Sequence, residues 1–275
     1  KTLARDLVKL GWTECKHEPG VWVLKEGGHI VGYLTVYVDD CILACSTKKR
    51  SEAEVEKINA IHPLSLIETK NDNGTIKFDM CGADVEINPT KRTLRVSMEN
   101  YIKKILKKFD MEKAIGRNHP SFPEENLYNK QSAPCGFEYR SCVGALQWLA
   151  TIARPDIAHS TNMLARANCE KVTNAMAKCC RLVMKYLIKT MSVGINYSPA
   201  IEAEFNRKYE EITKHDENKD AQKQLIKEPV HTFTDASFGV SYKELRSITG
   251  IVIYLHGTPI AWKSKVQSLF TSSTS

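Results

Sequence analysis

Helical and extended hydrophobic patterns alternate in the first part of the chain. Residues 1–10 carry three leucines that would share one side of a helix: Leu3, Leu7 and Leu10. Residues 21–24 and 30–38 are uncharged apolar runs of strand length, separated by a glycine pair that favours a turn. This order predicts one amphipathic helix followed by two strands.

A second helix and further strands are predicted before residue 97. Ser51 and Glu54 have the spacing of a capping box, so a helix is expected to begin at Ser51. Residues 78–87 and 93–96 alternate between apolar and polar side chains, which predicts two short strands. The first 96 residues therefore combine strands and helices.

From residue 97 the hydrophobic period becomes helical. In residues 98–111 the apolar side chains would lie on one side of a helix. Four lysines would lie mostly on the other side: Lys103, Lys104, Lys107 and Lys108. Three more helices are predicted at 138–153, 155–167 and 172–190, and Pro155 is placed like a proline that opens a helix. The lysines could contact nucleic-acid phosphates or form a solvated helix face.

The last eighty residues contain a highly charged segment followed by strand-like apolar runs. Residues 196–229 are crowded with charged side chains and are expected to be a linker or surface insertion. Residues 230–233, 248–255 and 259–262 then read as three strands. The whole pattern predicts an α+β protein.

Composition narrows the class of protein. The chain has 275 residues, of which 42% are hydrophobic, so a packed core is expected rather than disorder. The net charge of +7 is compatible with nucleic-acid binding. Nine cysteines without a CxxC pair argue against zinc and favour a reducing compartment, cytoplasmic or nuclear. No signal peptide or membrane-spanning run is present, so we expect neither secretion nor a membrane partner.

The residues with the clearest chemistry are Asp39 and Asp40, which lie where two apolar runs meet. Two adjacent carboxylates repel each other unless a positive charge lies beside them. A divalent ion such as Mg²⁺ or Mn²⁺ accepts carboxylate oxygens, and paired ions of this kind catalyse phosphoryl transfer. The alternative is a polar turn, because Asp is common where a chain reverses.

Five motifs in the same order resemble those of copia-type LTR retrotransposon polyproteins. The turn YVDD is similar to the YxDD box of reverse transcriptases. Residues 98–111 (MENYIKKILKKFDM) and 137–156 (FEYRSCVGALQWLATIARPD) resemble the family's YIxxILKKFxM and YRSxVGxLxYLxxxxRPD segments. Residues 246–250 (RSITG) and 260–268 (IAWKSKVQS) resemble RKSTSGY and ISWKSKKQ. The matches extend along nearly the whole chain.

This resemblance implies a division into four parts. Residues 1–96 would be a partial polymerase palm, residues 97–195 a helical thumb and connection, and residues 196–229 the charged insertion. Residues 230–275 would begin a truncated RNase H-like α/β domain. The implied function is RNA-directed DNA polymerase with RNase H, within the rest of a retroelement polyprotein in the cytoplasm, in virus-like particles or in the nucleus.

The resemblance also assigns roles to individual residues. Asp39 and Asp40 would hold the catalytic Mg²⁺ or Mn²⁺, and Tyr37 would position the primer end. Asp235, in the motif TDAS, would be the first metal-binding carboxylate of the RNase H domain. The four lysines of residues 103–108 would contact duplex phosphates. The implied partners are an RNA template, a DNA primer, an RNA–DNA hybrid and a dNTP.

Two departures from the family limit the expected activity. The family carries another catalytic Asp on a strand upstream of YxDD, but Asp6 is the only earlier Asp here and lies in a helical pattern. Ser275 stands where the RNase H domain would place a Glu. We therefore expect a fragment of the enzyme that does not extend a primer by itself.

Two alternatives remain open from the sequence. The chain could be a non-catalytic nucleic-acid-binding remnant of a retroelement. It could also fail to fold stably alone, because a missing palm strand would leave an exposed sheet edge beside residues 31–38.

Overall fold

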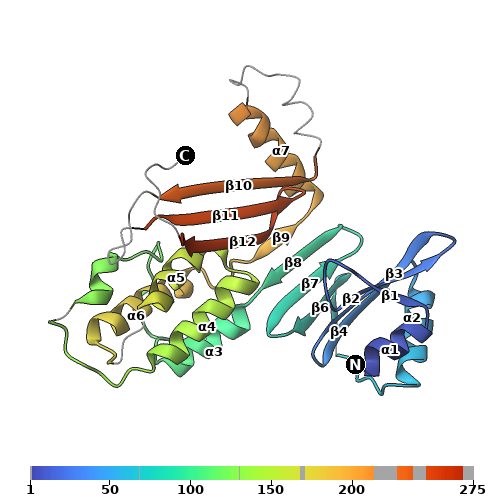
Figure 1. The fold of residues 1–275 in the computed structure, drawn as a ribbon, viewed down its shortest axis with the longest axis horizontal. Coiled ribbons are helices and arrows are strands. Elements are labelled where there is room, and N and C mark those ends of the chain that lie inside the picture. Colours follow the sequence, from blue (N-terminus) through green and yellow to red (C-terminus); the bar gives the residue numbers. More distant parts are fainter. Residues whose placement is uncertain are drawn as a thin grey trace. The chain divides into compact units, whose positions relative to one another are not determined.

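The computed structural model describes residues 2–67, 69–129, 131–167, 171–213, 228–237 and 246–268. These residues form seven α-helices and three antiparallel sheets (Figure 1). The chain divides into two compact units, residues 1–68 (unit 1) and residues 69–275 (unit 2). The predicted α+β class is confirmed.

Unit 1 is a four-stranded antiparallel sheet with two helices over one face. Its elements are α1 Thr2–Lys9, β1 Trp12–Glu14, β2 Val21–Glu26, β3 His29–Tyr37, β4 Asp40–Cys45 and α2 Lys48–Asn59. Trp22, Leu24 and Leu34 alternate along β2 and β3 and pack against Leu7 of α1 and Ile58 of α2. The predicted first helix and the two strands after it are confirmed.

The position of the free sheet edge differs from the expectation. The strand order is β1-β2-β3-β4, so β3 is hydrogen-bonded on both sides. Gly32, for example, lies opposite Leu24 on one side and Cys45 on the other. The expected exposed edge beside residues 31–38 is therefore wrong, and the edge strands are β1 and β4.

Helix α2 begins three residues earlier than the capping box predicted. Thr47 has extended backbone angles, and its hydroxyl accepts a hydrogen bond from the backbone N of Arg50 at 3.2 Å, so Thr47 is the N-cap. Ser51 lies inside the helix, and its Oγ accepts a hydrogen bond from the backbone N of Cys45 at 3.3 Å. Ser51 therefore joins α2 to the end of β4 instead of capping the helix.

Unit 2 contains a five-stranded antiparallel sheet in the order β5-β6-β7-β8-β9. Its strands are β5 Lys70–Asp72, β6 Thr75–Met80, β7 Ala83–Asn88, β8 Thr93–Ser97 and β9 Ile195–Tyr197. The single strand predicted at 78–87 is a hairpin, because Cys81 and Gly82 both have positive φ and reverse the chain. Strand β9 comes from a hundred residues downstream and pairs Ile195 with Val96.

Four helices of unit 2 share one hydrophobic core. They are α3 Glu99–Lys108, α4 Tyr139–Ile152, α5 Ala158–Arg166 and α6 Asn174–Lys189, with short 3₁₀ helices at Glu124–Tyr128 and Pro155–Ile157. These bounds confirm the predicted helices, including Pro155 at a helix start. Arg154 is fully buried, forms an ion pair with Asp156 at 2.7 Å and donates to the carbonyl of Thr190, so its role is structural.

The segment 196–229, expected to be a charged linker or surface insertion, contains a helix in its first part. Helix α7 (Pro199–Thr213) occupies its first part, whereas residues 214–227 lie outside the described residues. Phe205 and Tyr209 of α7 make ring contacts with Phe233 and His231 on the sheet that follows. The charged composition did not indicate that α7 has an aromatic face that packs on β10.

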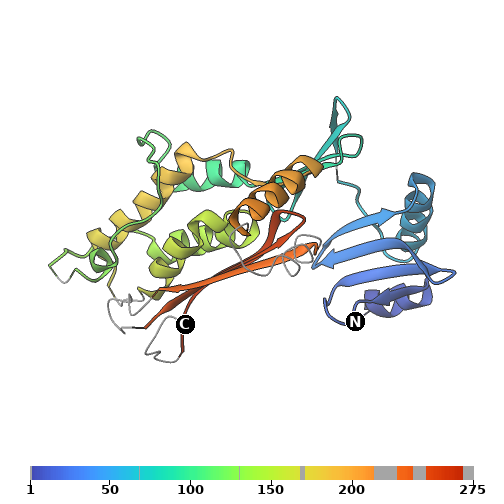
Figure 2. The ribbon, with the colours of Figure 1, turned by 90° about the horizontal axis from the view of Figure 1, so that it is seen from above.

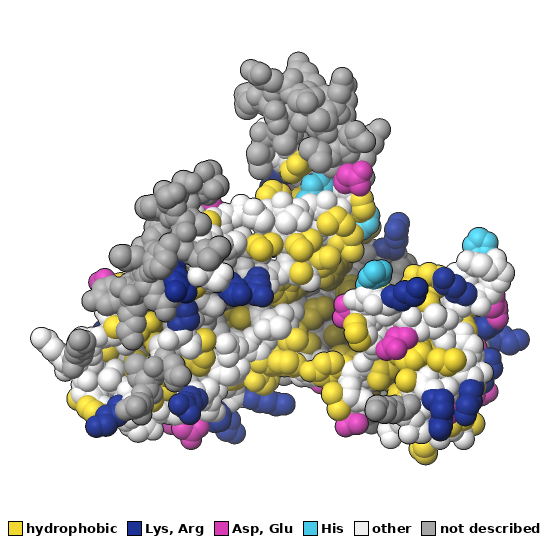
Figure 3. Space-filling model, viewed as in Figure 1, with side chains coloured by type: hydrophobic (Ala, Val, Ile, Leu, Met, Phe, Trp, Pro, Cys, Tyr) yellow, Lys and Arg dark blue, Asp and Glu magenta, His cyan; other side chains and the backbone are white. Residues whose placement is uncertain are grey.

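The third sheet is the predicted meander, β10 Val230–Ser237, β11 Ile248–Leu255 and β12 Thr258–Val266. Within unit 2, Figure 2 shows this sheet on one side of the helices, with α3 and α6 on the side away from it. Hydrophobic side chains gather over β10–β12 in the view of Figure 3. The indole Nε1 of Trp262 donates to the carbonyl of Ala150 at 2.6 Å and so fastens β12 to α4.

All eight cysteines in the described part of the chain are free thiols, and Cys169 lies outside it. Among the described residues, no helix is both long and apolar enough to span a membrane.

Candidate functional site

The aspartate pair lies at the end of the β3–β4 hairpin in unit 1. Tyr37 and Asp40 are the last paired residues of the two strands, so Val38 and Asp39 alone make the turn. Two-residue hairpin turns need a positive φ at the first central position, and Val38 supplies it with φ of 54°. Valine rarely adopts this angle, because its branched side chain crowds the backbone. The turn therefore stores local strain in the motif that carries the carboxylates.

The side chains of this turn are open to solvent. Val38 is 79% exposed and Tyr37 is 57% exposed, and Asp39 is also exposed. Among the described residues, none makes a hydrogen bond or ion pair with the Asp39 carboxylate. Desolvation raises the pKa of the neighbouring Cys41 thiol, and the negative charge of Asp40 raises it further. The turn is thus a locally negative, oxygen-rich tip.

The donor chemistry of the turn suits a hard divalent ion, but the number of donors is small. Carboxylate oxygens are the ligands that Mg²⁺ prefers. In the described parts of both units, however, no group of three or more His, Cys, Asp or Glu side chains is placed to hold a metal. Asp39 and Asp40 can therefore supply part of a metal site, and a further ligand would have to come from elsewhere.

Asp6 is not that further ligand. It is buried on α1, and its Oδ1 accepts hydrogen bonds from Lys9 at 3.0 Å and Arg5 at 3.4 Å, while Oδ2 lies 3.3 Å from His62 Nε2. The hydrogen bond from Lys9 lowers the pKa of Asp6, and the charges of Lys9 and Arg5 lower it further against the opposing effect of desolvation. The structure therefore confirms that Asp6 belongs to a helix and uses its oxygens there.

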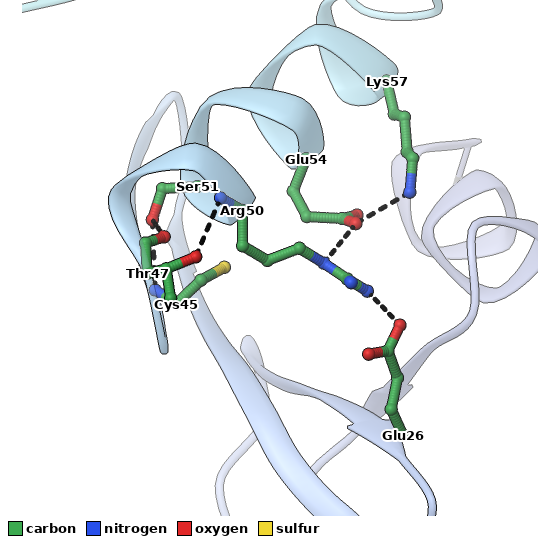
Figure 4. Close-up of polar contacts among 7 residues, drawn as sticks. All are labelled: Glu26, Cys45, Thr47, Arg50, Ser51, Glu54 and Lys57. Carbon is green, nitrogen blue, oxygen red and sulfur yellow. Dashed lines mark hydrogen bonds and ion pairs between the residues drawn. The ribbon is translucent and has the colours of Figure 1, made fainter.

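An ion network centred on the buried Glu54 anchors α2 to the end of β2 (Figure 4). The Glu54 side chain is fully buried, and its Oε1 accepts from Arg50 Nε at 3.1 Å and from Lys57 Nζ at 2.8 Å. Arg50 also donates to Glu26 at the end of β2, at 2.5 Å. We did not predict this network. The sequence feature that indicates it is the spacing of Arg50 four residues before Glu54 and Lys57 three residues after it. This spacing puts the three side chains on one face of the helix.

Asp235 lies on β10, opposite Gly250 of β11. Its side chain is exposed, and Oδ1 accepts from the backbone N of Ala236 at 2.8 Å. Asp235 also lines a cleft of about 280 Å³ between the sheet and the start of α5, which includes His159 and Ser237. Burial lowers the pKa of His159, and the positive charge of Arg166 lowers it further. The expected strand is confirmed, and residues 269–275, where the family's next carboxylate would fall, lie outside the described residues.

The four predicted lysines of α3 fall into two pairs. Lys103 forms an ion pair with Glu99 at 2.7 Å, and Lys108 lies 3.5 Å from Glu138. In the described structure, Lys104 and Lys107 have no acidic partner. Asp39 and Asp40 lie in unit 1, whereas Asp235 and these lysines lie in unit 2.

Several proteins of retrotransposons are similar to this chain over nearly its whole length. The "Retrovirus-related Pol polyprotein from transposon RE1" of Arabidopsis thaliana is 26% identical over 263 residues, which cover 95% of this chain. The polyprotein from transposon RE2 of the same plant is 23% identical over 263 residues. A transposon Ty5-1 protein of Saccharomyces cerevisiae is 23% identical over 268 residues and is covered to 73% of its length. This chain is a homologue of copia-type retrotransposon Pol polyproteins.

The homology confirms the family resemblance inferred from the motifs. This chain spans 15% of the length of the RE1 polyprotein and 16% of that of RE2. No family model and no solved structure matches it. The roles of Asp39, Asp40, Asp235, Tyr37 and the α3 lysines therefore remain predictions.

Proposed function

We propose that the β3–β4 hairpin belongs to the palm of an RNA-directed DNA polymerase. The observation that supports this most is a carboxylate pair, the exposed Asp39 and the half-buried Asp40, at a strained two-residue turn in a chain homologous to Pol polyproteins. Strained backbone is common at functional sites, where the surrounding structure holds it in place. A simple polar turn would more often use Gly or Asn at the position of Val38.

In this proposal Asp39 and Asp40 hold Mg²⁺ or Mn²⁺, and the substrates are an RNA template, a DNA primer and a dNTP. Such ions, when bound, activate the primer hydroxyl and neutralise charge on the leaving pyrophosphate. Tyr37, exposed one residue before the turn, would lie against the primer end. Lys104 and Lys107, which lack acidic partners, are better placed to contact phosphates than Lys103 and Lys108.

A third carboxylate is needed to bracket two ions, and the edge of the sheet indicates where it would enter. β4 begins at Asp40 and has no partner strand on its outer side among the described residues. A strand paired there would place alternate side chains beside Asp40, at the spacing of cross-strand neighbours. We propose that the missing carboxylate is carried by such a strand. Without it, the 275-residue chain should not extend a primer.

We also propose that the β10–β12 meander carries Asp235 as one carboxylate of an RNase H site acting on an RNA–DNA hybrid. Asp235 lines a cleft, and its strand β10 is the first strand of a three-stranded meander, as the resemblance implies. Further metal ligands would be required, as for the polymerase site. The alternative of a non-catalytic remnant is not favoured, because the relatives are named as Pol polyproteins.

A chimaera tests the polymerase proposal. This chain would replace the matching 263-residue stretch of the RE1 polyprotein, which would supply the remaining protein. We expect magnesium-dependent DNA synthesis on an RNA template, reduced at least about 10²-fold by Asp39→Asn, because the metal loses a charged ligand. Asp72→Asn, at the last strand residue before the turn of another hairpin, should leave synthesis unchanged. A soluble chimaera with a cooperative melt but no synthesis, beside an active RE1 control, would contradict the proposal.

A further inference from the structure

Strand β12 is an edge of the β10–β12 sheet, and a groove runs along its free side. The strand order is β10-β11-β12, so among the described residues β12 pairs with β11 on one side and with no strand on the other. Five consecutive residues of β12, 260–264, line a groove of about 730 Å³. Successive residues of a strand point to opposite faces of the sheet, so a groove that all five line must follow the strand edge. We call it the β12 groove.

The other wall of the β12 groove is formed by α4 and α5, and in Figure 1 β12 is the strand of its sheet that lies beside these helices. The hydrogen bond from Trp262 to Ala150 holds β12 against α4. Thr161 is only 2% exposed, and neither its Oγ1 nor the Oδ1 of Asn162 has a hydrogen-bond partner in the described structure. Buried polar atoms are almost always hydrogen-bonded in folded proteins. Both residues line the groove, so a polar occupant would supply the missing partners.

The charge of the β12 groove is positive. Among the described residues that line it there is no Asp or Glu, whereas Lys263 is one of them. Lys265 follows two residues later and therefore lies on the same face of the sheet. On β11 the residues opposite these lysines are the uncharged Ile251 and Thr249. Neither lysine forms an ion pair with a described carboxylate, so both charges are uncompensated there.

The β5–β9 sheet shows how strand cations of this chain are compensated elsewhere. Lys77 of β6 lies 3.3 Å from Asp72 of β5, and Arg95 of β8 lies 3.8 Å from Glu86, its opposite residue on β7. Opposite charges on neighbouring strands stabilise a sheet. On β12 the inner neighbours carry no charge, so only a strand on the free side could bring acidic side chains beside the two lysines.

Two other occupants match the β12 groove less well. Antiparallel pairing of two β12 edges would bring the lysines of both copies together on one face of the sheet, and like charges there are destabilising. A phosphate backbone would match the charge but not the strand edge. The edge presents both N–H and C=O groups, whereas phosphate oxygens only accept hydrogen bonds. A polypeptide with acidic side chains satisfies both the edge and the charge.

We propose that the β12 groove binds an extended acidic segment of a partner protein, which adds to the sheet as a fourth strand. Acidic side chains at alternate positions of that segment lie beside Lys263 and Lys265. The side chains between them face α4 and α5, where the small Ala150 and Ala158 leave room. Backbone hydrogen bonds supply affinity in this mode of recognition, and alternate side chains supply specificity. Lysines at the edge also disfavour strands without acidic residues.

The test uses the full chain and two synthetic heptapeptides made otherwise of valine and threonine. The acidic peptide has glutamate at its third and fifth positions, and the control peptide has lysine at both. Fluorescence anisotropy measures affinity, and amide hydrogen exchange locates the bound peptide on the chain. The outer edge of β10 is an internal control, because it also has no partner strand among the described residues.

We expect the acidic peptide to bind and to slow exchange in residues 260–264 but not in β10. Lys263→Gln with Lys265→Gln should weaken binding about tenfold, because two cross-strand charge pairs are lost. Lys77→Gln with Lys103→Gln removes the same charge from cations that are already paired, and should stay within about twofold of the unmodified chain. Thr151→Trp, at an exposed position of the groove wall, should block binding without a change in charge.

Several results would overturn the proposal. They are no binding of the acidic peptide, equal affinity for the two peptides, or slowed exchange at β10 in place of β12. Exchange in residues 260–264 that slows with rising protein concentration alone would identify a second copy as the occupant. Slowing by an RNA–DNA hybrid and not by the acidic peptide would identify nucleic acid. None of these results bears on the polymerase proposal, because Asp39 lies in unit 1 and the β12 groove in unit 2.

Discussion

Val38 adopts a left-handed backbone angle that a β-branched side chain tolerates poorly, and it does so while 79% exposed. No buried contact of its side chain explains the choice of valine. The strain is therefore local to the turn that presents Asp39. A substitution at position 38 can therefore measure that strain as a change in the free energy of unfolding.

Val38→Gly should leave unit 1 equally stable or raise its free energy of unfolding by up to about 1 kcal/mol, because glycine adopts positive φ without crowding. Val8→Gly on α1 is the matched control. Val8 is 60% exposed but helical, so the same substitution there should cost about 1 kcal/mol. Hydrogen exchange of β3 amides reports on unit 1 alone, and equal losses in both variants would show that the turn is unstrained.

Asp6 makes the acid stability of unit 1 depend on one carboxylate. Its pKa lies below the ordinary value of 3.8, chiefly through the hydrogen bond from Lys9. A lowered pKa in the folded state stabilises the protein above the ordinary value, and this contribution is lost as the pH falls through the lowered pKa. Asp6→Asn should therefore be less stable than the unmodified chain at neutral pH.

The difference between Asp6→Asn and the unmodified chain should shrink as the pH is lowered below about 4. Urea unfolding at a series of pH values from 7 to 2.5 measures it. Glu56→Gln, at an exposed position of α2 without an ion pair among the described residues, should show little difference at any pH. A deficit of Asp6→Asn that persists undiminished in acid would contradict the assigned ion pairs.

At the scale of elements, helix α2 is held to the sheet of unit 1 by charge, through Arg50 and Glu26 of β2, as well as by apolar packing. Glu54→Gln should lower the stability of unit 1 by about 2 kcal/mol, because Arg50 and Lys57 lose their buried anion. Both cations are partly exposed and can regain water, which keeps the cost below that of a fully buried pair. Glu52→Gln, whose pair with Lys48 is exposed, should cost at most about 0.5 kcal/mol. Equal effects would show that the network does not hold the helix.

Elements with a strong local signal were predictable. Leu3, Leu7 and Leu10 indicated α1, and the apolar period of residues 98–111 indicated α3, because both patterns report a buried helix face. The turn at Cys81 and Gly82 was missed, since a non-glycine residue with positive φ has no distinctive sequence signal. The pairing of β8 with β9 was also missed, because it joins segments a hundred residues apart and depends on the packing of the helices between them.

The start of α2 shows how two local signals can compete. Thr47 and Ser51 are both good N-cap residues, and Ser51 had the better sequence pattern with Glu54. The structure instead uses Thr47 as the cap, because Ser51 bonds to Cys45 and Glu54 is buried in an ion network. Tertiary contacts of both residues decided the helix start, and these contacts were not visible in the sequence.

At the scale of the whole molecule, the chain divides into two compact units at residue 68. The palm–thumb boundary at residue 96, which the family resemblance implies, stays a prediction. The β5–β9 sheet joins the helical unit because β9, after α6, completes it. Motif order along the chain identified the family, and the homology to Pol polyproteins confirmed it. The hairpin position of Asp39 and Asp40 was predictable from the two apolar runs.

The central claim is that the Val38–Asp39 turn binds a divalent cation. Paramagnetic broadening of backbone amide resonances during a Mn²⁺ titration of the full chain tests it most directly. The turns that follow Asp72 and Asp79 are internal controls, because each follows a single aspartate. We expect broadening to appear first at residues 38–41 and to disappear in Asp39→Asn. Equal broadening at all three turns, or broadening at residues 38–41 that survives Asp39→Asn, would contradict the claim.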